Sequence, residues 1–147
     1  MEAKDFFHQV QRAEEELKLL GAQIRHFEDI GFSLSGGNFG APVVSRSRSV
    51  SRVEAAAIGL YDATKQLEDQ AREYLAIVEK AKRVISAMPH ERYQKILRYR
   101  YLSGWSYRSI SDELGYTDSN SIYRAHGWAL QEAQQVLDKM KKEKAGE

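Results

Sequence analysis

The chain is 147 residues long, enough for one compact domain or two small ones, and its 22 lysines and arginines nearly balance its 21 aspartates and glutamates. This balance identifies no class of partner, although 42% hydrophobic and 29% charged residues are typical of a soluble protein with a core. The sequence has no cysteine, which excludes disulfides and cysteine-ligated zinc. No apolar run approaches the roughly 18 residues of a membrane span, and the acidic amino terminus does not resemble a signal peptide. We therefore expect a cytoplasmic protein that does not enter a membrane.

Residues 1–30 are predicted to form a first helix. Apolar residues recur there at alternating gaps of four and three, which is the heptad spacing of a helix that packs along one seam. A narrow seam needs a partner helix, because it stabilises an isolated helix too little to offset the cost of ordering the chain. The seam positions are Phe6, Val10, Ala13, Leu17, Leu20, Ile24 and Phe27.

Residues 31–52 are predicted to form a flexible basic loop. They contain four glycines and a proline, lack acidic residues, and show neither a helical nor a strand period. Arg46, Arg48 and Arg52 give this segment three positive charges. A flexible linker is the favoured interpretation. The alternative is a basic arm that contacts DNA phosphates.

Residues 53–88 are predicted to form one long helix with a second heptad seam. Ser51 and Glu54 have the spacing of a capping box at its start, and Pro89 marks its end. The small residues in the seam suit close packing, so we expect either a helical hairpin with the first helix or a coiled coil in a homo-oligomer. The seam positions are Val53, Ala57, Leu60, Thr64, Leu67, Ala71, Tyr74, Val78, Ala81, Ile85 and Met88.

Residues 89–147 are predicted to form a helix-turn-helix domain, which completes an all-α fold. A first helix is expected over residues 91–102, a short second helix over 106–115, and a long final helix from Asn120 to about residue 142. Ser111 lies four positions before the glycine that ends the second helix. A small residue at this position lets two helices cross closely, as the helix-turn-helix arrangement requires.

The carboxy-terminal third also resembles a known family. Residues 95–107 (KILRYRYLSGWSY) and 110–117 (ISDELGYT) look like the opening and the core of sigma factor region four. Residues 121–130 (SIYRAHGWAL) are similar to a stretch of RinA/ArpU-type phage transcriptional regulators, which the serine-arginine loop and residues 53–58 also resemble. The resemblance implies a phage or prophage transcription activator that works in a bacterial host cell and contacts the host RNA polymerase.

The first turns of the final helix are the predicted reading surface for double-stranded DNA. In a helix-turn-helix these turns meet base edges in the major groove, where asparagine pairs with adenine and arginine with guanine. The alternative interpretation is an ordinary solvated helix start, with Asp118 or Ser119 as its cap. The candidate reading residues are Ser119, Asn120, Ser121, Tyr123 and Arg124.

Phosphate contacts are predicted around this surface. Ser106 and Arg108 open the second helix of the motif, where a helix amino terminus and a cation suit a phosphate. Gly127 would permit close approach of DNA or of another helix. The start of the final helix has one basic residue, Arg124, so the arginines of residues 31–52 are the next expected source of electrostatic affinity.

Several other residues of this domain are expected to be structural. Trp105 and Tyr107 are predicted to pack into the core, and His126 to be a partly buried histidine. Arg98 and Arg100 are predicted to lie on a mixed surface, with Arg100 in an intramolecular ion pair.

The sequence predicts a sequence-specific DNA-binding transcription regulator and no enzyme. It has no catalytic constellation, phosphate-binding loop or metal-ligand spacing, so no cofactor or metal site is expected. One alternative is a phage packaging protein, because small terminase subunits also combine a helix-turn-helix with helical oligomerisation segments. The other is a helical adaptor that binds proteins through its seams and does not bind DNA.

Overall fold

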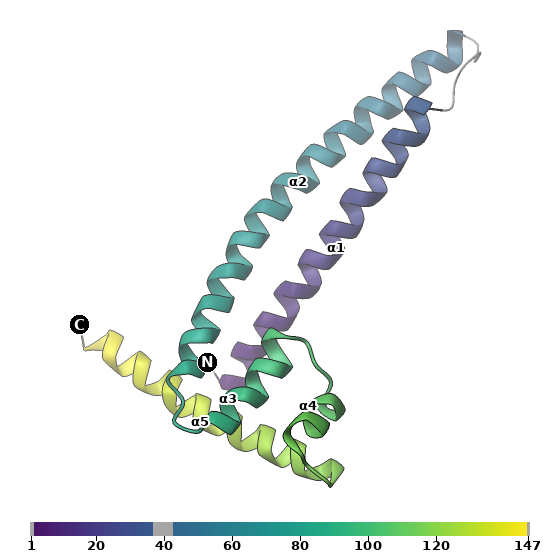
Figure 1. Ribbon diagram of the computed structural model, residues 1–147. Coiled ribbons are helices and arrows are strands. Elements are labelled where there is room, and N and C mark those ends of the chain that lie inside the picture. Colours follow the sequence, from purple (N-terminus) through teal and green to yellow (C-terminus); the bar gives the residue numbers. More distant parts are fainter. Residues whose placement is uncertain (1, 37–42, 147) are drawn as a thin grey trace. The chain divides into compact units, whose positions relative to one another are not determined.

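The computed structural model describes residues 2–36 and 43–146, with side chains for residues 2–31 and 51–146. Within these ranges the regular elements are helical and no strand occurs, so the all-α prediction is confirmed for them. The elements (Figure 1) are α1 (Ala3–Gly36), α2 (Val43–Ser86), α3 (Glu91–Leu97), the π-helical turn η1 (Arg98–Leu102), α4 (Tyr107–Leu114) and α5 (Ser119–Ala145).

The chain divides into two compact units whose limits differ from the expected domain boundaries. Unit 1 contains Met1–Arg12 and Tyr74–Glu147, and unit 2 contains Ala13–Glu73. Helices α1 and α2 each contribute residues to both units. The expected domain of residues 89–147 is therefore one part of a larger compact unit, which also includes the first turns of α1 and the end of α2.

The expected loop over residues 31–52 is helical at both ends. Helix α1 continues to Gly36 and α2 begins at Val43, which leaves residues 37–42 outside the described part of the chain. The absence of an apolar period did not prevent these turns from forming. A continuing helix satisfies its own backbone hydrogen bonds, and arginine is one of the better helix formers.

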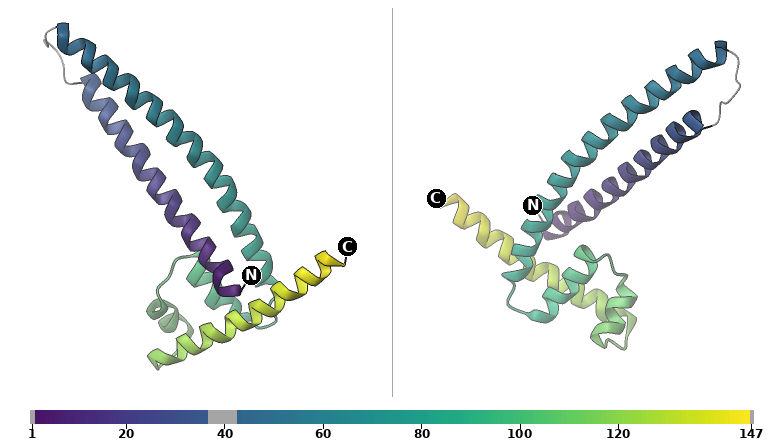
Figure 2. Two further views of the ribbon diagram at one scale, coloured as in Figure 1. Left: turned by 180° about the vertical axis from the view of Figure 1, so that it is seen from behind. Right: turned by 45° about the horizontal axis from the view of Figure 1, so that its top comes forward.

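The core of unit 1 joins the beginning of the chain to its carboxy-terminal helices. Phe7 of α1 is fully buried, and its ring stacks on that of Tyr101 with the centroids 5.0 Å apart. Ile85 of α2 and Ala129 of α5 belong to the same apolar cluster. The views in Figure 2 agree in placing the amino-terminal turns of α1 beside α5. Burial of large aromatic rings is a main source of stability in such a core.

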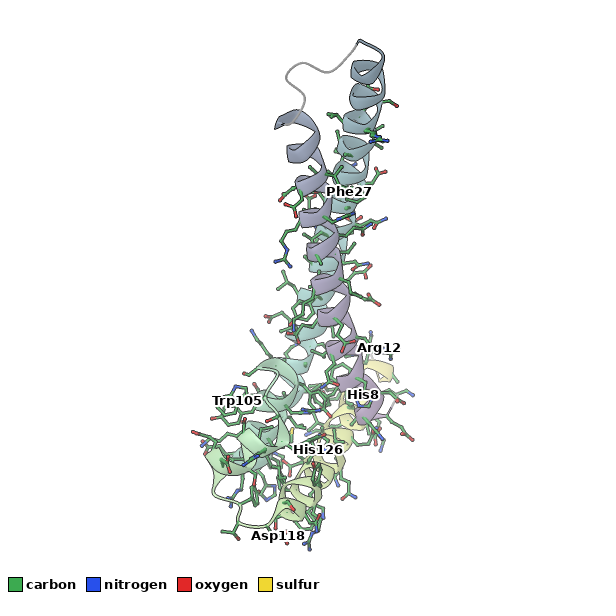
Figure 3. The ribbon with its side chains drawn as sticks, turned by 90° about the vertical axis from the view of Figure 1, so that its right-hand side faces the viewer. His8, Arg12, Phe27, Trp105, Asp118 and His126 are labelled. Carbon is green, nitrogen blue, oxygen red and sulfur yellow. The ribbon has the colours of Figure 1, made fainter. Side chains whose placement is uncertain are left out.

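Unit 2 pairs part of α1 with part of α2. The Phe27 ring (Figure 3) lies so close to Gly59 that a Cβ atom there would be 2.7 Å from the ring. The seven predicted seam positions of α1 are all buried or half-buried. In α2, however, Ala56 and Ala63 are buried, whereas the predicted seam residues Ala57 and Thr64 are exposed.

The difference in α2 has a physical reason. A helix of 3.6 residues per turn brings both the third and the fourth following residue to the same side, so either could join the seam. Thr64 does not need the interior, because its hydroxyl donates a hydrogen bond to the Leu60 carbonyl at 2.7 Å. The small face of Ala56, Gly59 and Ala63 is the one turned inward, and Gly59 on it accommodates the Phe27 ring.

Candidate functional site

Local signals fix both ends of helix α4. Ser106 lies before the helix in extended backbone, and its Oγ accepts a hydrogen bond from the Ser109 N–H at 3.2 Å. Gly115 ends the helix with a φ of +78°, a left-handed conformation that residues with a Cβ rarely adopt. The Tyr116 N–H donates to the Ser111 carbonyl at 2.9 Å, which closes the turn toward α5.

Asp118 caps the start of α5. Its Oδ1 accepts a hydrogen bond from the Asn120 N–H at 3.0 Å, and its own backbone is extended. Helix α5 begins at Ser119, one residue before the predicted start at Asn120. Of the two residues considered as caps, Asp118 is the cap and Ser119 is the first helical residue.

A small apolar core joins α3, α4 and α5. Ile96, Ile110, Ile122 and Ala125 are at most 2% exposed and form one cluster. Ser111 is also buried, as expected for a small residue at a position where two helices cross closely. Partly buried residues pack around this cluster, among them Tyr93, Tyr99, Trp105, Tyr107, Leu114 and Tyr116. Trp105 and Tyr107 therefore pack against the core as expected.

The opposite side of α5 is open to solvent. Asn120, Tyr123, Arg124, Gly127 and Trp128 recur every three or four residues, so they share one side of the helix, which we call the α5 outer face. Tyr123 is 56% exposed and Trp128 is 52% exposed. No heavy atom lies within 4 Å of the position that a Cβ at Gly127 would take. The face thus combines amide, guanidinium and aromatic groups around an uncovered stretch of backbone.

Neighbouring side chains orient two members of the α5 outer face. The Arg124 Nη2 lies 3.8 Å from the Asp118 Oδ2 in an exposed ion pair. Such a pair contributes little to stability, but it holds the guanidinium beside the helix start. The Tyr123 ring packs on the Tyr107 ring with centroids 4.9 Å apart. Asp118 therefore contacts both the backbone and a side chain of the same helix.

The other predicted contact residues have different surroundings. A pocket of about 300 Å³ between α4 and α5 brings together Arg108, Ser119 and Tyr123. Ser121 is half-buried on the flank of α5. The Ser106 oxygen already serves as the α4 cap, so any phosphate contact there would use its hydroxyl hydrogen or the helix backbone.

The predicted basic arm is part of α2. Arg52 is exposed and belongs to unit 2, whereas the α5 outer face belongs to unit 1. Arg46 and Arg48 lie in the first turns of α2, and their side chains fall outside the described residues. Contact between this arginine segment and DNA stays a prediction.

A hydrogen-bonded aromatic cluster supports the inner side of α5. The Tyr101 hydroxyl and His126 Nε2 are hydrogen-bonded at 2.9 Å, and the Tyr107 ring contacts the imidazole edge to face. The Arg100 guanidinium lies 4.1 Å from the centre of the Tyr107 ring and donates from Nη1 to the Trp105 carbonyl at 3.1 Å. Arg100 thus contacts a ring and a carbonyl here, where an ion pair was expected.

This environment keeps both partners of the central hydrogen bond uncharged. Burial, together with the nearby positive charge of Arg100, lowers the pKa of His126 to about 4. Burial also raises the pKa of Tyr101, so its hydroxyl remains protonated. Figure 3 shows His126 between Asp118 and His8 within unit 1. The prediction of a partly buried structural histidine is confirmed.

Two further contacts of unit 1 were not predicted. Glu132 of α5 is 9% exposed, and its carboxylate accepts from the His90 N–H at 3.0 Å and pairs with His90 Nδ1 at 2.6 Å. Arg92 donates from Nη2 to the Leu114 carbonyl at 2.7 Å at the end of α4. The signal for Glu132 was its place on the inner face of α5 beside Ala133, where a carboxylate needs a hydrogen-bonding partner.

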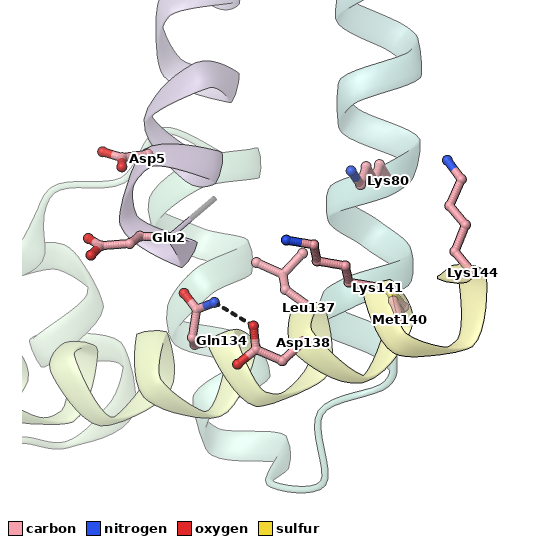
Figure 4. A pocket seen from close by; sticks show the side chains of 9 residues that line it. All are labelled: Glu2, Asp5, Lys80, Gln134, Leu137, Asp138, Met140, Lys141 and Lys144. Atoms are coloured by element: carbon pink, nitrogen blue, oxygen red, sulfur yellow. Dashed lines mark hydrogen bonds between the residues drawn. The ribbon is translucent and has the colours of Figure 1, made fainter. Parts of the chain in front are cut away.

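A separate pocket of about 660 Å³ lies between the ends of α1, α2 and α5 in unit 1 (Figure 4). Lys80, Lys141 and Lys144 line it together with acidic residues, and Gln134 donates to Asp138 at 3.0 Å. Because charges of both signs line this pocket, its charge does not favour an anion over a cation.

In the described part of the chain, no three histidine, aspartate or glutamate side chains lie close enough to hold a metal ion. No helix among the described residues is long and apolar enough to cross a membrane.

Comparison with known proteins gives no relative. No family model, curated protein or solved structure matches this chain.

Proposed function

We propose that this protein binds double-stranded DNA and regulates transcription, with α4, the turn at Gly115 and α5 as its helix-turn-helix. The observation that supports this proposal most directly is the α5 outer face. Helix α5 is held by a buried inner side, while Asn120 and Arg124 in its first turns are presented to solvent. A helix held in this way by a preceding short helix has the layout that docks in a major groove.

The chemistry of the outer face suits base recognition. Asn120 offers the paired donor and acceptor that match adenine, and Arg124 offers the fork that matches guanine. The exposed rings of Tyr123 and Trp128 offer apolar contact to thymine methyl groups. Gly127 leaves room for a sugar or phosphate to approach the helix backbone.

Phosphate contacts would set the register of the helix on the duplex. The amino terminus of α4 presents backbone N–H groups near Ser106, and Arg108 in its first turn is exposed. A helix amino terminus and a nearby cation together favour a phosphate. The resemblance to sigma factor region four and to RinA/ArpU-type regulators supports transcription control in a phage or its bacterial host. Contact with the host RNA polymerase is part of the same proposal.

The test is selection of bound fragments from a random DNA pool at a stated salt concentration, because phosphate contacts make affinity strongly dependent on salt. We expect one sequence motif to be enriched. Arg124→Ala should weaken binding to that motif by about tenfold or more. Lys139→Ala removes the same charge from an exposed position farther along α5 and serves as the matched control, with a much smaller effect.

The outcomes separate this proposal from its alternatives. Absence of any enriched motif would contradict the proposal and favour a helical adaptor. Equal losses in Arg124→Ala and Lys139→Ala would show binding through charge alone. A closed ring of many copies in solution would favour a DNA-packaging protein, in which the same α5 face would still read DNA.

A further inference from the structure

Helix α2 carries a second heptad stripe that unit 2 does not use. Ile58, Tyr61, Lys65, Glu68 and Arg72 are all exposed, and their gaps of three and four residues place them along one side of the helix. We call these five residues the α2 stripe. Ile58 is 64% exposed and Tyr61 is 62% exposed, although both are large apolar or aromatic side chains.

The α2 stripe lies away from the inner face of the hairpin. Successive residues of an α-helix are about 100° apart, so the stripe is centred roughly 150° around α2 from the buried line of Ala56, Leu60 and Ala63. These inner residues already face α1, as the contact between Gly59 and the Phe27 ring shows. The apolar seam of α2, which was predicted to need a partner helix, is therefore covered by α1 of the same chain. An oligomer would need another surface.

The order of charges along the α2 stripe is self-complementary. Consider an antiparallel pairing with a second copy, in which the two-fold axis passes between residues 66 and 67. Each residue of one copy then faces the residue of the other copy for which the two residue numbers add up to 133. Lys65 then meets Glu68, and Tyr61 meets Arg72, each twice because the axis repeats every contact. The same rule gives Ile58 the counterpart Leu75, which is itself 59% exposed.

The opposite orientation is unfavourable. In a parallel pairing Lys65 faces Lys65 and Glu68 faces Glu68, so like charges oppose each other throughout the centre. The antiparallel arrangement replaces these like-charge contacts with contacts between opposite charges. It also brings Arg72 of the second copy to the exposed Tyr61 ring. Within one chain the Lys65 ammonium already lies 5.3 Å from the centre of this ring, so the ring is open to a cation. The one unfavourable pair of the antiparallel arrangement, Glu54 with Glu79, lies at the solvated ends, where Glu79 is paired with Lys82.

From this complementarity we infer that the α2 stripe binds a second copy of the same chain, antiparallel and two-fold symmetric. The interface is isologous, so it closes as a dimer and does not propagate. This inference does not depend on DNA binding and holds for any function of the protein. For a DNA-binding protein it would supply two copies of the α5 outer face for a two-part site.

Charge reversal in the full-length protein tests the interface by sedimentation velocity. The wild type is expected to be dimeric at about 100 µM, which requires only a modest affinity. Lys65→Glu and Glu68→Lys each place like charges in both central contacts, so each should weaken the dimer by about tenfold or more. The double variant K65E/E68K exchanges the charges and should restore the wild-type affinity. Arg25→Glu, an exposed reversal on α1, is the control and should leave the dimer unchanged.

Mixing gives the sharpest result. Equal amounts of the Lys65→Glu and Glu68→Lys proteins should form heterodimers at concentrations where each alone is monomeric, because every central contact then joins opposite charges. Helical content measured by circular dichroism confirms that each variant is folded. A monomeric wild type at this concentration, or single variants that dimerise as well as the wild type, would overturn the inference. A double variant as weak as the single variants would also overturn it.

Discussion

His126 should make unit 1 sensitive to acid. Its ring is hydrogen-bonded to the Tyr101 hydroxyl, and burial together with the positive charges of Arg100, His8 and Lys4 lowers its pKa to about 4. In the unfolded chain a histidine has a pKa of about 6.5. Between these two values the unfolded state binds a proton that the folded state does not. The stability of unit 1 is therefore complete above about pH 6.5 and falls as the pH decreases toward 4.

The size of the loss follows from the shift. A pKa lowered from 6.5 to about 4 corresponds to at most about 3 kcal/mol of unfolding free energy. The ring is only partly buried, so water screens its charge and the expected loss is about 1–2 kcal/mol. Tryptophan fluorescence reports on unit 1 alone, because Trp105 and Trp128 are the two tryptophans of the sequence and both belong to it.

The assay is urea unfolding followed by tryptophan fluorescence at neutral pH and at about pH 4.5. His126→Asn keeps an oxygen that can accept from the Tyr101 hydroxyl but cannot titrate, so it should lose much less stability in acid than the wild type. Tyr101→Phe should cost about 1–2 kcal/mol at neutral pH and retain the acid sensitivity. An acid loss in His126→Asn as large as in the wild type would refute the assignment to this histidine.

Three further predictions concern α5. Gly127→Ala should stabilise unit 1 by up to about 1 kcal/mol in thermal unfolding, because no atom of the chain obstructs the new methyl group; a loss would mean that packing requires this glycine. Glu132→Ala should lower the unfolding free energy by about 1–3 kcal/mol, since it removes both contacts to His90; urea unfolding identical to the wild type would contradict this. If α5 reads DNA, Asp118→Asn should keep the helix cap but release Arg124, so binding assays should show higher nonspecific affinity and several-fold lower selectivity. Parallel changes in both affinities would argue against that role for Asp118.

The caps of α4 and α5 could be predicted because they depend on few neighbouring residues, whereas Ser51, the expected cap of a helix starting at residue 53, lies inside α2. Ser106 at the start of α4, Gly115 at its end and Asp118 before α5 each act on backbone groups within a few positions. The side of α5 that faces inward was also predictable, because Ile122 and Ala125 begin an apolar period of three to four residues that continues along the helix. The start of α5 was placed one residue late because Asp118 and Ser119 are both capable caps.

The pairing within α2 was harder to predict because the sequence offers two nearly equivalent seams. Ala56 and Ala57 have the same side chain, and so contribute the same apolar area to either pattern. The choice depends on how the Phe27 ring fits over Gly59, a contact between residues far apart in the sequence. The second stripe on the outer side of α2 mixes charges with apolar residues and was hidden by the stronger apolar period.

The composition of unit 1 was unpredictable for a related reason. Nothing local indicates that Phe7 stacks on Tyr101, or that Glu132 accepts hydrogen bonds from His90. The segments that these contacts join are far apart in the sequence, and the helical pattern of each segment can be explained without the other. A sequence pattern identifies which side of a helix is apolar, but it does not identify which of several apolar partners will cover it.

The contact between the two ends of unit 1 has a consequence during protein synthesis. The Ala3 N–H donates to the Gln134 side chain across 131 residues of sequence. A ribosome that adds about 5–20 residues per second needs roughly 7–26 s to make that stretch. Throughout this interval the first turns of α1, with Phe6 and Phe7, lack part of the carboxy-terminal helices that pack against them in unit 1. Slower translation of the last third should therefore lengthen the time in which this aromatic segment can be bound by chaperones or aggregate.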